Sequence, residues 1–324
     1  MSSRIIGVEF GHDTLKLAAV SGGTVTAMAV ERLPDGLVRD GRVTAPDAMY
    51  LFIKEACAAH GIRRGPCALV LPKEVLITRR ITMPLMGVDE LKLNLPFEFR
   101  DFVGKESGKY TYDYAMVSHT DSTMEIFAAA VLTEALDEYE DILRRAGLKL
   151  RASMPPEMAW LNLIRSCDTE PEQLCIVDVG AAGTHVNIYR ANAFEMGKDI
   201  PIGGLDLDRA IAAAESVDPF VARTHKEADL NGVQSLPQCV DIYGELSIEI
   251  MRVLNFYASS TPEGAKLQDL YFCGGGCDIE GLRTAIIKRT DFTPHSIRRL
   301  LNDREDSAAA GSCAMAVGAA MQLQ

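Results

Sequence analysis

The chain has 324 residues, of which 48% are hydrophobic and 24% are charged, and its formal net charge is −12. This length allows two domains, and the composition allows a large buried core and argues against extensive disorder. The acidic balance argues against a general nucleic-acid-binding protein, which would carry a basic surface. It does not exclude anionic ligands, because backbone amides and one or two lysines can hold a phosphate.

The eight cysteines are scattered through the sequence, without a CxxC pair or zinc-finger spacing. This pattern predicts reduced and mostly buried thiols. The N-terminal stretch MSSRIIGVEFG predicts neither a signal peptide nor a membrane anchor. No apolar stretch approaches the roughly 20 residues that span a bilayer, so any connection to a membrane is expected to go through a partner protein.

The first part of the chain reads as strands followed by a helix. Short β-rich runs separated by Gly, Asp and Ser predict strands over 4–10, 14–20 and 24–33. Apolar residues at helical spacing predict a helix over 45–62 that stops at Gly61, and a buried strand follows over 67–72.

Residues 73–147 predict a small α+β insert with the order strand–helix–strand–strand–helix. The strands are expected over 75–84, 110–119 and 123–132. The first helix is expected over 87–103, where Pro96 kinks or divides it. The second is expected to open at Thr133 and stop at Gly147.

The second half of the chain repeats the opening pattern. A strand and a helix over 150–167 and a polar linker, DTEPEQ, precede a new β-hairpin over 174–190, and a third strand follows the hairpin. Helices are expected at about 204–216, 238–258, 278–290 and 308–322, with a strand ending in three glycines at 267–276. We therefore predict a first domain over 1–72, completed by 148–170 and 308–324, the insert over 73–147, and a second domain over 171–307.

Both hairpin turns carry residues that suit an anion. In the first, Gly11 permits a backbone whose N–H groups can face an anion, and Lys16 can add a positive charge. In the second, Asp178 ends a strand and could hold Mg²⁺, and Thr184 could bind a phosphate. An ordinary hairpin turn explains either stretch taken alone.

Two further glycine motifs stand where a strand or loop enters a helix. Gly203 and Gly204 precede a helix, where free N–H groups suit a phosphate or a ribose hydroxyl. Gly274, Gly275 and Gly276 leave backbone against which a flat ring can lie, although a tight strand-to-helix turn explains them equally. The sequence lacks a dinucleotide-binding GxGxxG, a P-loop and an HExxH motif.

The order of these pieces resembles the actin-like ATPase superfamily, an α/β class with two duplicated, ribonuclease H-like domains that flank a nucleotide cleft. Within it, the chain resembles the type IV pilus assembly protein PilM family, which is related to FtsA. The resemblance runs over most of the chain and is carried by LPKEVLITRRITMP, VDELKLNLPFEF, the stretch from IFAAAVLTEAL to MPPEMAWLNLI, CIVDVGAAGTHVNIYR, IPIGGLDLDRAI, LYFCGGGCDIEGL and AMAVGAAMQ.

The resemblance implies ATP and Mg²⁺ as ligands and assigns residues to them. The first phosphate turn maps onto Gly11, His12, Asp13 and Lys16, and the second onto Asp178, Gly180 and Thr184. The glycines beside the phosphates map onto Gly203 and Gly204, and the lysine at the nucleoside maps onto Lys226. The adenine turn maps onto Gly274, Gly275 and Gly276. Asp178 and Glu9 would act on Mg²⁺ indirectly.

Three departures from the family pattern are visible. Glu9 stands where the family usually has Asp, Arg223 stands where it usually has Glu, and FVGKESGKY replaces an Ile-Pro-Phe-Pro stretch. They keep open a nucleotide-free adaptor of the same fold. A sugar or acid kinase of the superfamily is a further alternative, which would need a carboxylate base beside a substrate pocket. Any ATPase activity is expected to be slow.

The resemblance also implies a partner and a location. PilM-like proteins are cytoplasmic scaffolds that lie at the inner membrane through a bitopic protein, PilN, whose N-terminal cytoplasmic tail they bind in a groove between the first domain and the insert. We expect the same of this chain, with strand addition or apolar anchoring as the mode of binding.

Overall fold

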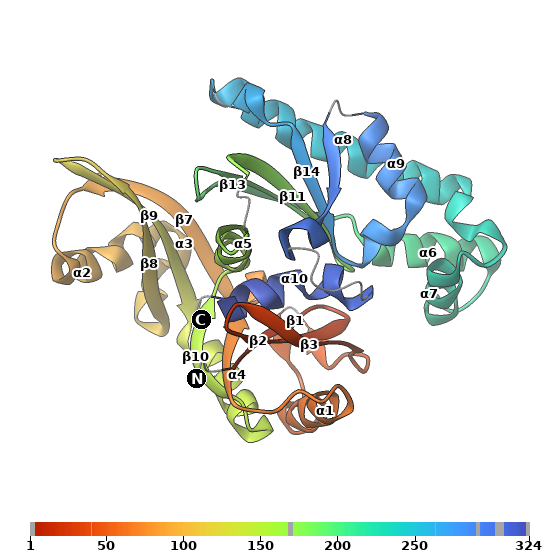
Figure 1. Cartoon of the computed structure of the whole chain (residues 1–324), viewed down its shortest axis with the longest axis horizontal. Coiled ribbons are helices and arrows are strands. Elements are labelled where there is room, and N and C mark those ends of the chain that lie inside the picture. Colours follow the sequence, from red (N-terminus) through yellow and green to blue (C-terminus); the bar gives the residue numbers. More distant parts are fainter. Residues whose placement is uncertain are drawn as a thin grey trace. The chain divides into compact units, whose positions relative to one another are not determined.

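The computed structural model describes residues 4–39, 41–167, 171–262, 264–289, 292–301 and 308–321. The chain divides into two compact units (Figure 1). The first unit comprises Met1–Ser166 and Met315–Gln324, and the second comprises Cys167–Ala314. The domain boundaries expected from the sequence stay a prediction.

The first unit is built on a five-stranded sheet with the order β10-β6-β1-β2-β3. Strands β10, β6 and β1 are parallel, and β1, β2 and β3 are antiparallel. The strand bounds are β1 Ile5–Phe10, β2 Thr14–Ser21, β3 Thr24–Arg32, β6 Pro66–Val70 and β10 Lys149–Met154. Because parallel strands end at the same edge, the segments that follow β1, β6 and β10 meet there.

Helices α1 (Pro46–Ala59) and α4 (Thr133–Ala146) cover one face of this sheet. Their buried side chains, such as Met49, Ile53 and Tyr139, share one hydrophobic cluster with alternate residues of β1 and β2. A short ribbon of β4 (Val38–Arg39) and β5 (Arg42–Val43) lies before α1 in the chain. Helix α4 ends at Gly147, which has φ +83° and forms the left-handed stop expected from the sequence.

Helix α5 (Pro156–Arg165) packs closely on the part of α10 (Ala308–Met321) that belongs to this unit, from Met315 onward. A Cβ added at Gly318 would lie 2.0 Å from the carbonyl oxygen of Ala159 in α5. A Cβ added at Gly7 in β1 would lie 1.7 Å from the carbonyl oxygen of Ala316. Glycine at these two positions therefore lets α10 approach the backbone of both elements.

The insert is a three-stranded antiparallel sheet with the order β7-β9-β8. Its elements are β7 Leu76–Pro84, α2 Val88–Glu98, α3 Arg100–Val103, β8 Tyr110–His119 and β9 Thr123–Leu132, with 3₁₀ turns at Lys73–Val75 and Gly104–Lys109. Leu91, Leu95 and Phe99 pack on one face of the sheet in a hydrophobic cluster of the insert's own residues. Pro96 lies within α2, and the break between α2 and α3 falls at Phe99.

The second unit is built on a sheet with the order β13-β12-β11-β14-β15. Strands β11, β14 and β15 are parallel, and β11, β12 and β13 are antiparallel. The strands are β11 Gln173–Val179, β12 Thr184–Arg190, β13 Ala193–Ile200, β14 Asp269–Cys273 and β15 Thr293–Ser296, and the helices are α6 Gly204–Glu215, α7 Pro219–Ala228, α8 Pro237–Ser260 and α9 Glu280–Lys288. Three short 3₁₀ turns lie at Leu230–Ser235, Gly264–Lys266 and Gly275–Asp278, and a fourth at Ile297–Leu301.

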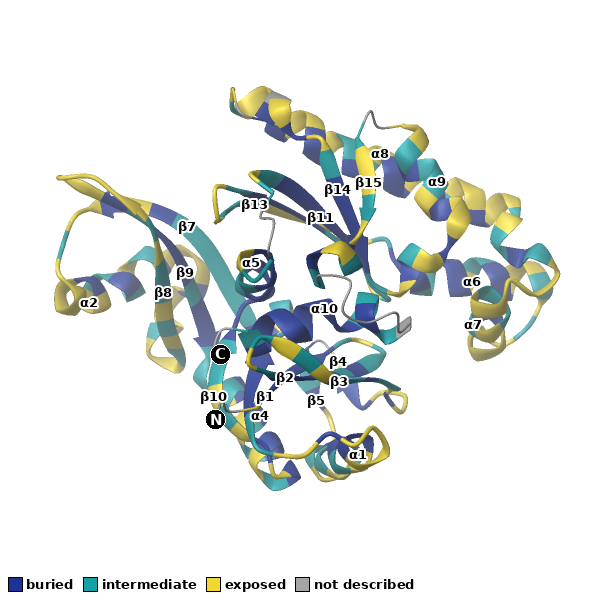
Figure 2. Cartoon of the chain, viewed as in Figure 1, coloured by how far each residue is buried: buried dark blue, intermediate teal, exposed yellow. Residues whose placement is uncertain are grey.

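Strands β11 and β14 are almost entirely buried (Figure 2), and most of their buried residues are apolar. Helices α6, α8 and α9 pack on one face of the sheet through a single hydrophobic cluster that includes Val177, Leu246 and Ile286. Two elements were not expected from the sequence. Helix α7 buries Ala222 and no other residue, and β15, which reads TPHS, is short and polar, so neither has a strong apolar pattern.

In the described part of the chain, no helix combines the length and the apolar character needed to cross a membrane. The terminal helix was expected to reach residue 322, which lies outside the described residues.

Candidate functional site

The second hairpin turn joins β11 to β12 and is closed by its own backbone. The Gly180 N–H donates to the Gly183 carbonyl at 2.9 Å. Asp178 is the penultimate residue of β11, and 7% of its surface is exposed. Thr184 is fully buried and its hydroxyl donates to the Ile202 carbonyl at 2.8 Å. Thr184 therefore ties the turn to the loop after β13 rather than pointing into solvent.

The glycine pair after β13 packs directly on this turn. The Gly204 N–H donates to the Gly180 carbonyl at 3.0 Å, and the Leu205 N–H donates to the Ala181 carbonyl at 2.9 Å. A Cβ at Gly203 would lie 2.5 Å from the Ala181 oxygen and 2.8 Å from the Gly180 oxygen. The Asp206 carboxylate accepts from the Gly203 N–H at 2.9 Å and so caps α6. Glycine is required at position 203 because the backbone there packs directly on the backbone of Gly180 and Ala181.

Lys226 reaches this glycine pair from α7. Its ammonium donates to the Gly204 carbonyl at 2.9 Å and lies 2.6 Å from the Asp208 carboxylate, which is buried in α6. Arg223, one helical turn earlier, donates to the other oxygen of Asp208 at 3.0 Å. One buried carboxylate thus faces two cations beside Gly204.

The three-glycine turn after β14 lies against the end of β11. The two strands are parallel neighbours, with Asp178 opposite Cys273. Gly274 has φ +82°, and a Cβ there would lie 2.5 Å from the Asp178 Oδ1 atom. A Cβ at Gly276 would lie 2.3 Å from the Val179 side chain. Glycine is required in this turn because the Asp178 carboxylate and the β11 backbone occupy the space.

Cys277 follows this turn and stays a protonated thiol. Burial raises its pKa far above the ordinary range, and the nearby Asp178 carboxylate raises that pKa further. Its Sγ atom contacts the Cys273 carbonyl oxygen. Six of the eight cysteines are buried, and the sequence predicted that most of them would be.

The second unit therefore gathers one set of the residues predicted from the sequence at the carboxyl ends of β11 and β14. Gly275 continues the turn between Gly274 and Gly276, with open space beside it. The gathered residues are Asp178, Gly180, Thr184, Gly203, Gly204, Lys226, Gly274, Gly275 and Gly276.

The first hairpin turn lies in the first unit, between β1 and β2. The Gly11 N–H donates to the Thr14 carbonyl at 2.8 Å, so this turn is closed as the second one is. Glu9 and Lys16 lie opposite each other on the two strands, and their charged atoms are 2.5 Å apart. His12 and Asp13 pair with each other at 2.9 Å at the exposed tip. The positive charge of Lys16 is therefore shared with the carboxylate that was expected to act near Mg²⁺.

Two charged residues at the same edge of this sheet were missed from the sequence. Lys73 follows β6 and Glu157 opens α5 after β10, and their charged atoms lie 3.7 Å apart. Glu157 is only 5% exposed. The available signal was that each stands within three residues of the end of a strand, in LVLPK and SMPPE. Together with Glu9 and Lys16, they place two carboxylates and two ammonium groups at the edge where β1, β6 and β10 end.

The donor set fits a magnesium ion that is carried by phosphates. No group of three or more His, Cys, Asp or Glu side chains suited to a metal occurs among the described residues. Mg²⁺ in nucleotide sites usually takes one or two carboxylates, with water and phosphate oxygens completing its shell. Asp178, at the end of β11 and beside the Gly180 turn, suits that role.

Comparison with solved structures identifies the class of fold. The PilM-PilN type IV pilus biogenesis complex matches with a TM-score of 0.85 and 23% identity, over 100% of this chain and 99% of that one. The ethanolamine utilization protein EutJ from Carboxydothermus hydrogenoformans matches with a TM-score of 0.65 and 14% identity, over 99% and 90% of the two chains. MreB5 of Spiroplasma citri bound to ADP matches with a TM-score of 0.54 and 11% identity, over 98% and 94%. The fold is actin-like, as the sequence predicted.

The family is shown by a model that covers most of the sequence. The chain belongs to the type IV pilus assembly protein PilM family, whose model matches residues 7–322. A UPF0597 protein of Chromobacterium violaceum is 32% identical over 155 residues, which are 46% of this chain. The match covers 34% of the length of that protein. The chain is therefore an actin-like member of a pilus assembly family.

Proposed function

We propose that the chain is a cytoplasmic scaffold of a type IV pilus or related machine that binds Mg·ATP and the N-terminal tail of a PilN-like membrane protein. The observation that carries the nucleotide part is the convergence of three glycine turns on the buried end of β11, beside Asp178. The solved relatives bound to ADP and to AMPPNP support it, because they share the fold at TM-scores of 0.54.

Each group in the second unit has a role in this proposal. The tip of the Gly180–Thr184 turn faces the phosphates, and the Gly203–Gly204 pair supports it, since the N–H groups of Gly180, Gly203 and Gly204 already donate within the protein. Asp178 orients Mg²⁺ through its water shell. Lys226 stands at the nucleoside, and the Gly274 turn forms a wall for the base. Gly11 to Lys16 of the first unit form the first phosphate turn. Nucleotide then acts as a structural ligand that stabilises the bound form.

Titration calorimetry of the full chain tests nucleotide binding. Asp178→Ala is expected to weaken Mg·ATP binding about 10- to 100-fold, the usual effect of removing a group that positions a metal. The matched control is Asp241→Ala, which removes an exposed carboxylate from α8 and is expected to leave the affinity unchanged.

A second titration in EDTA isolates the role of the metal. If Asp178 acts through Mg²⁺, the affinities of the wild type and of Asp178→Ala for metal-free ATP should converge. If Asp178→Ala loses the same factor in ATP affinity with and without Mg²⁺, the role assigned to Asp178 is contradicted. A wild type that binds no ATP would contradict the nucleotide proposal.

The partner part of the proposal rests on the insert and on the similarity to the PilM-PilN complex. Strands β7 and β8 are the two outer strands of the insert sheet, so each presents one edge to an added strand. Helix α2 also carries exposed apolar side chains, with Leu93 74% and Phe97 61% exposed. Both features suit a short peptide with alternating apolar residues.

Fluorescence polarisation with a labelled synthetic tail of the PilN-like protein tests this partner. The full chain is expected to bind the peptide, and Leu93→Ser with Phe97→Ser reports whether α2 or a strand edge holds it. Phe256→Ser, which changes an exposed phenylalanine of α8 in the second unit, is the control. Absence of binding both with and without ATP would refute the partner assignment.

One observation favours a second candidate, a nucleotide-free adaptor of the same fold. The cations expected to meet phosphates already have carboxylate partners, since Lys16 faces Glu9 and Lys226 faces Asp208. In an adaptor these pairs would hold the turns closed without a ligand. The two candidates differ in the calorimetric titration, because the adaptor binds no ATP and still binds the tail peptide.

A further inference from the structure

Helix α8 packs on the second unit through only one of its sides. Buried residues of that side, such as Tyr243 and Leu246, belong to the hydrophobic cluster on the sheet. Exposed residues recur along the rest of the helix (Figure 2), and three of them are large and apolar: Val240, Ile248 and Phe256 are 52%, 41% and 62% exposed. A row of exposed apolar residues along one helix indicates a contact surface.

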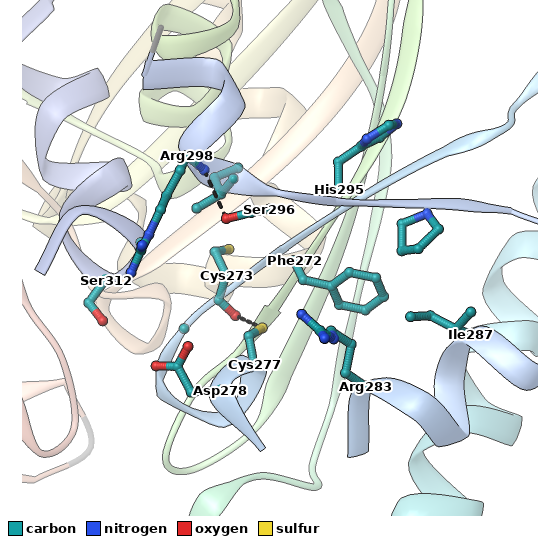
Figure 3. Close-up of a pocket in the computed structure, with 14 residues that line it drawn as sticks. Phe272, Cys273, Cys277, Asp278, Arg283, Ile287, His295, Ser296, Arg298 and Ser312 are labelled. Atoms are coloured by element: carbon teal, nitrogen blue, oxygen red, sulfur yellow. Dashed lines mark hydrogen bonds between the residues drawn. The ribbon is translucent and has the colours of Figure 1, made fainter. Parts of the chain in front are cut away.

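This row is separate from the pocket at the ends of β14 and β15. Figure 3 shows the side chains that line that pocket, and the two that come from the long helices beside it, Arg283 and Ile287, belong to α9. Among the described residues that line it, none comes from α8. Substitutions in the exposed row of α8 therefore leave the lining of the pocket unchanged.

The three apolar residues lie on one ridge of the helix. Residues four apart form inclined ridges on a helix surface, and the ridge through Ile248 reads Val240, Gly244, Ile248, Arg252 and Phe256. A Cβ at Gly244 meets nothing within 4 Å, so the ridge has a gap beside Ile248. The straighter stripe that a coiled coil would use is polar on both sides of Ile248. The pattern therefore favours crossed packing at about −50°, in which two such ridges interlock.

This ridge matches itself when it is reversed about Ile248. Val240 and Phe256 stand eight residues before and eight residues after Ile248. A second copy that crosses antiparallel therefore brings its Phe256 to the Val240 side at both margins of the contact, while Ile248 faces its own counterpart on the twofold axis. Contacts in which one patch meets the same patch of a second copy are the commonest arrangement in protein oligomers.

The charges on α8 match in the same arrangement. Arg252 of one copy faces Gly244 of the other, and Gly244 is flanked by the exposed carboxylates of Asp241 and Glu245. Within its own helix Arg252 pairs with Glu249, and a guanidinium has enough N–H donors for both contacts. A parallel arrangement would instead set Arg252 against Arg252, and like charges across an interface repel. Charge therefore favours the antiparallel pair.

We propose that α8 is a contact surface for a second copy of this chain, so that two copies associate through crossed, antiparallel α8 helices. The contact is small, with three apolar side chains from each copy, so it belongs to the weak and reversible class of interfaces. A dissociation constant of about 10–500 μM is expected. This inference does not depend on nucleotide binding, and it adds a surface for self-association to the scaffold role.

Sedimentation velocity of the full chain tests the proposal, over concentrations from well below to above the expected dissociation constant. At about 150 mM salt the screening length is about 8 Å, so the net charge of −12 on each copy opposes association only at short range. The wild type is expected to shift from monomer toward dimer as its concentration rises. A wild type that stays monomeric throughout overturns the proposal.

Ile248→Asp is the decisive variant, because it sets two carboxylates against each other on the twofold axis. It is expected to weaken association by more than about 10-fold. Leu51→Asp, which changes a 48% exposed residue of α1 in the first unit, is the matched control and should associate as the wild type does. Thermal melting confirms that each variant is folded. If folded Ile248→Asp associates like the wild type, the dimer uses another surface and the proposal is overturned.

A charge exchange tests the antiparallel register. Arg252→Glu should weaken association, because it places a third carboxylate beside Asp241 and Glu245 of the second copy. Adding Glu245→Arg to it should restore part of the lost affinity, because each new arginine then faces a new glutamate across the axis. If the double variant associates no better than Arg252→Glu alone, the antiparallel pairing is overturned.

Discussion

Gly203 illustrates how a single glycine lets one backbone pack on another, here on the hairpin turn between β11 and β12. Replacing it with Ala would place a methyl group within 2.5–2.8 Å of three backbone atoms of the turn. Gly203→Ala is therefore expected to lower the free energy of unfolding by about 1–3 kcal/mol, the usual cost of overpacking, and to weaken any ligand held by that turn. Urea denaturation measures the first effect.

Gly244→Ala is the matched control for this substitution. Gly244 lies in the interior of α8 with open space around its missing Cβ. Alanine there should raise the free energy of unfolding by about 0.5–1 kcal/mol, because glycine costs backbone entropy in a helix. Equal effects of the two substitutions would contradict the close contact at Gly203.

The sequence indicated the close backbone approaches better than it indicated which charged residues pair. Gly203 and Gly274 could be singled out because glycine before a helix or after a strand indicates a close backbone approach. The pairing of Lys16 with Glu9 depends on the register of β1 with β2, which puts the two residues directly opposite. Lys226 and Asp208 meet because α7 packs on α6, and α7 itself has too little apolar pattern to be predicted.

At the scale of elements, the insert sheet carries a cross-strand ion pair that makes its stability depend on pH. Arg80 of β7 binds Glu125 of β9 with two hydrogen bonds, at 2.6 and 3.1 Å. The hydrogen bonds from Arg80 lower the pKa of Glu125, although burial opposes them. A lowered pKa in the folded state means that the stabilisation is present above the unfolded value of about 4.3 and is lost as the pH falls below it.

Glu125→Gln is thus expected to cost about 0.2–1 kcal/mol of unfolding free energy at pH 7, and the difference from the wild type should shrink below about pH 4. Thermal melts from pH 7 to pH 3 measure this. Glu106→Gln, which breaks the exposed pair with Lys109, should show no such difference. A gap between Glu125→Gln and the wild type that stays constant with pH would contradict the ion-pair assignment.

The order of elements in the insert followed from sequence, whereas its helix break did not. Alternating apolar residues predicted β7, β8 and β9, and Gly147 predicted the end of α4. The break at Phe99 rather than Pro96 depends on tertiary packing, since Phe99 is fully buried against the sheet. Packing of that kind overrides local preference.

At the scale of the whole molecule, α10 stabilises the first unit by lying against α5 and β1. Gly318→Ala would push a methyl group to 2.0 Å from the Ala159 oxygen, so the helix must move away. We expect the free energy of unfolding to fall by about 1–3 kcal/mol, which a lower melting temperature would report. Gly311→Ala in the same helix meets its nearest atoms at 3.9 and 4.0 Å and should cause no loss. If both variants melt alike, α10 does not pack as described.

The insert encloses its own hydrophobic interior, formed by residues of α2, α3 and the β7-β9-β8 sheet. Substitutions on its outer surface therefore leave the glycine turns of β1 and β11 untouched. Selection can conserve those turns while the outer surface of the insert diverges from one lineage to another. Related pilus machines could in this way acquire new docking proteins by drift on one small subdomain, without rebuilding the actin-like body that carries it.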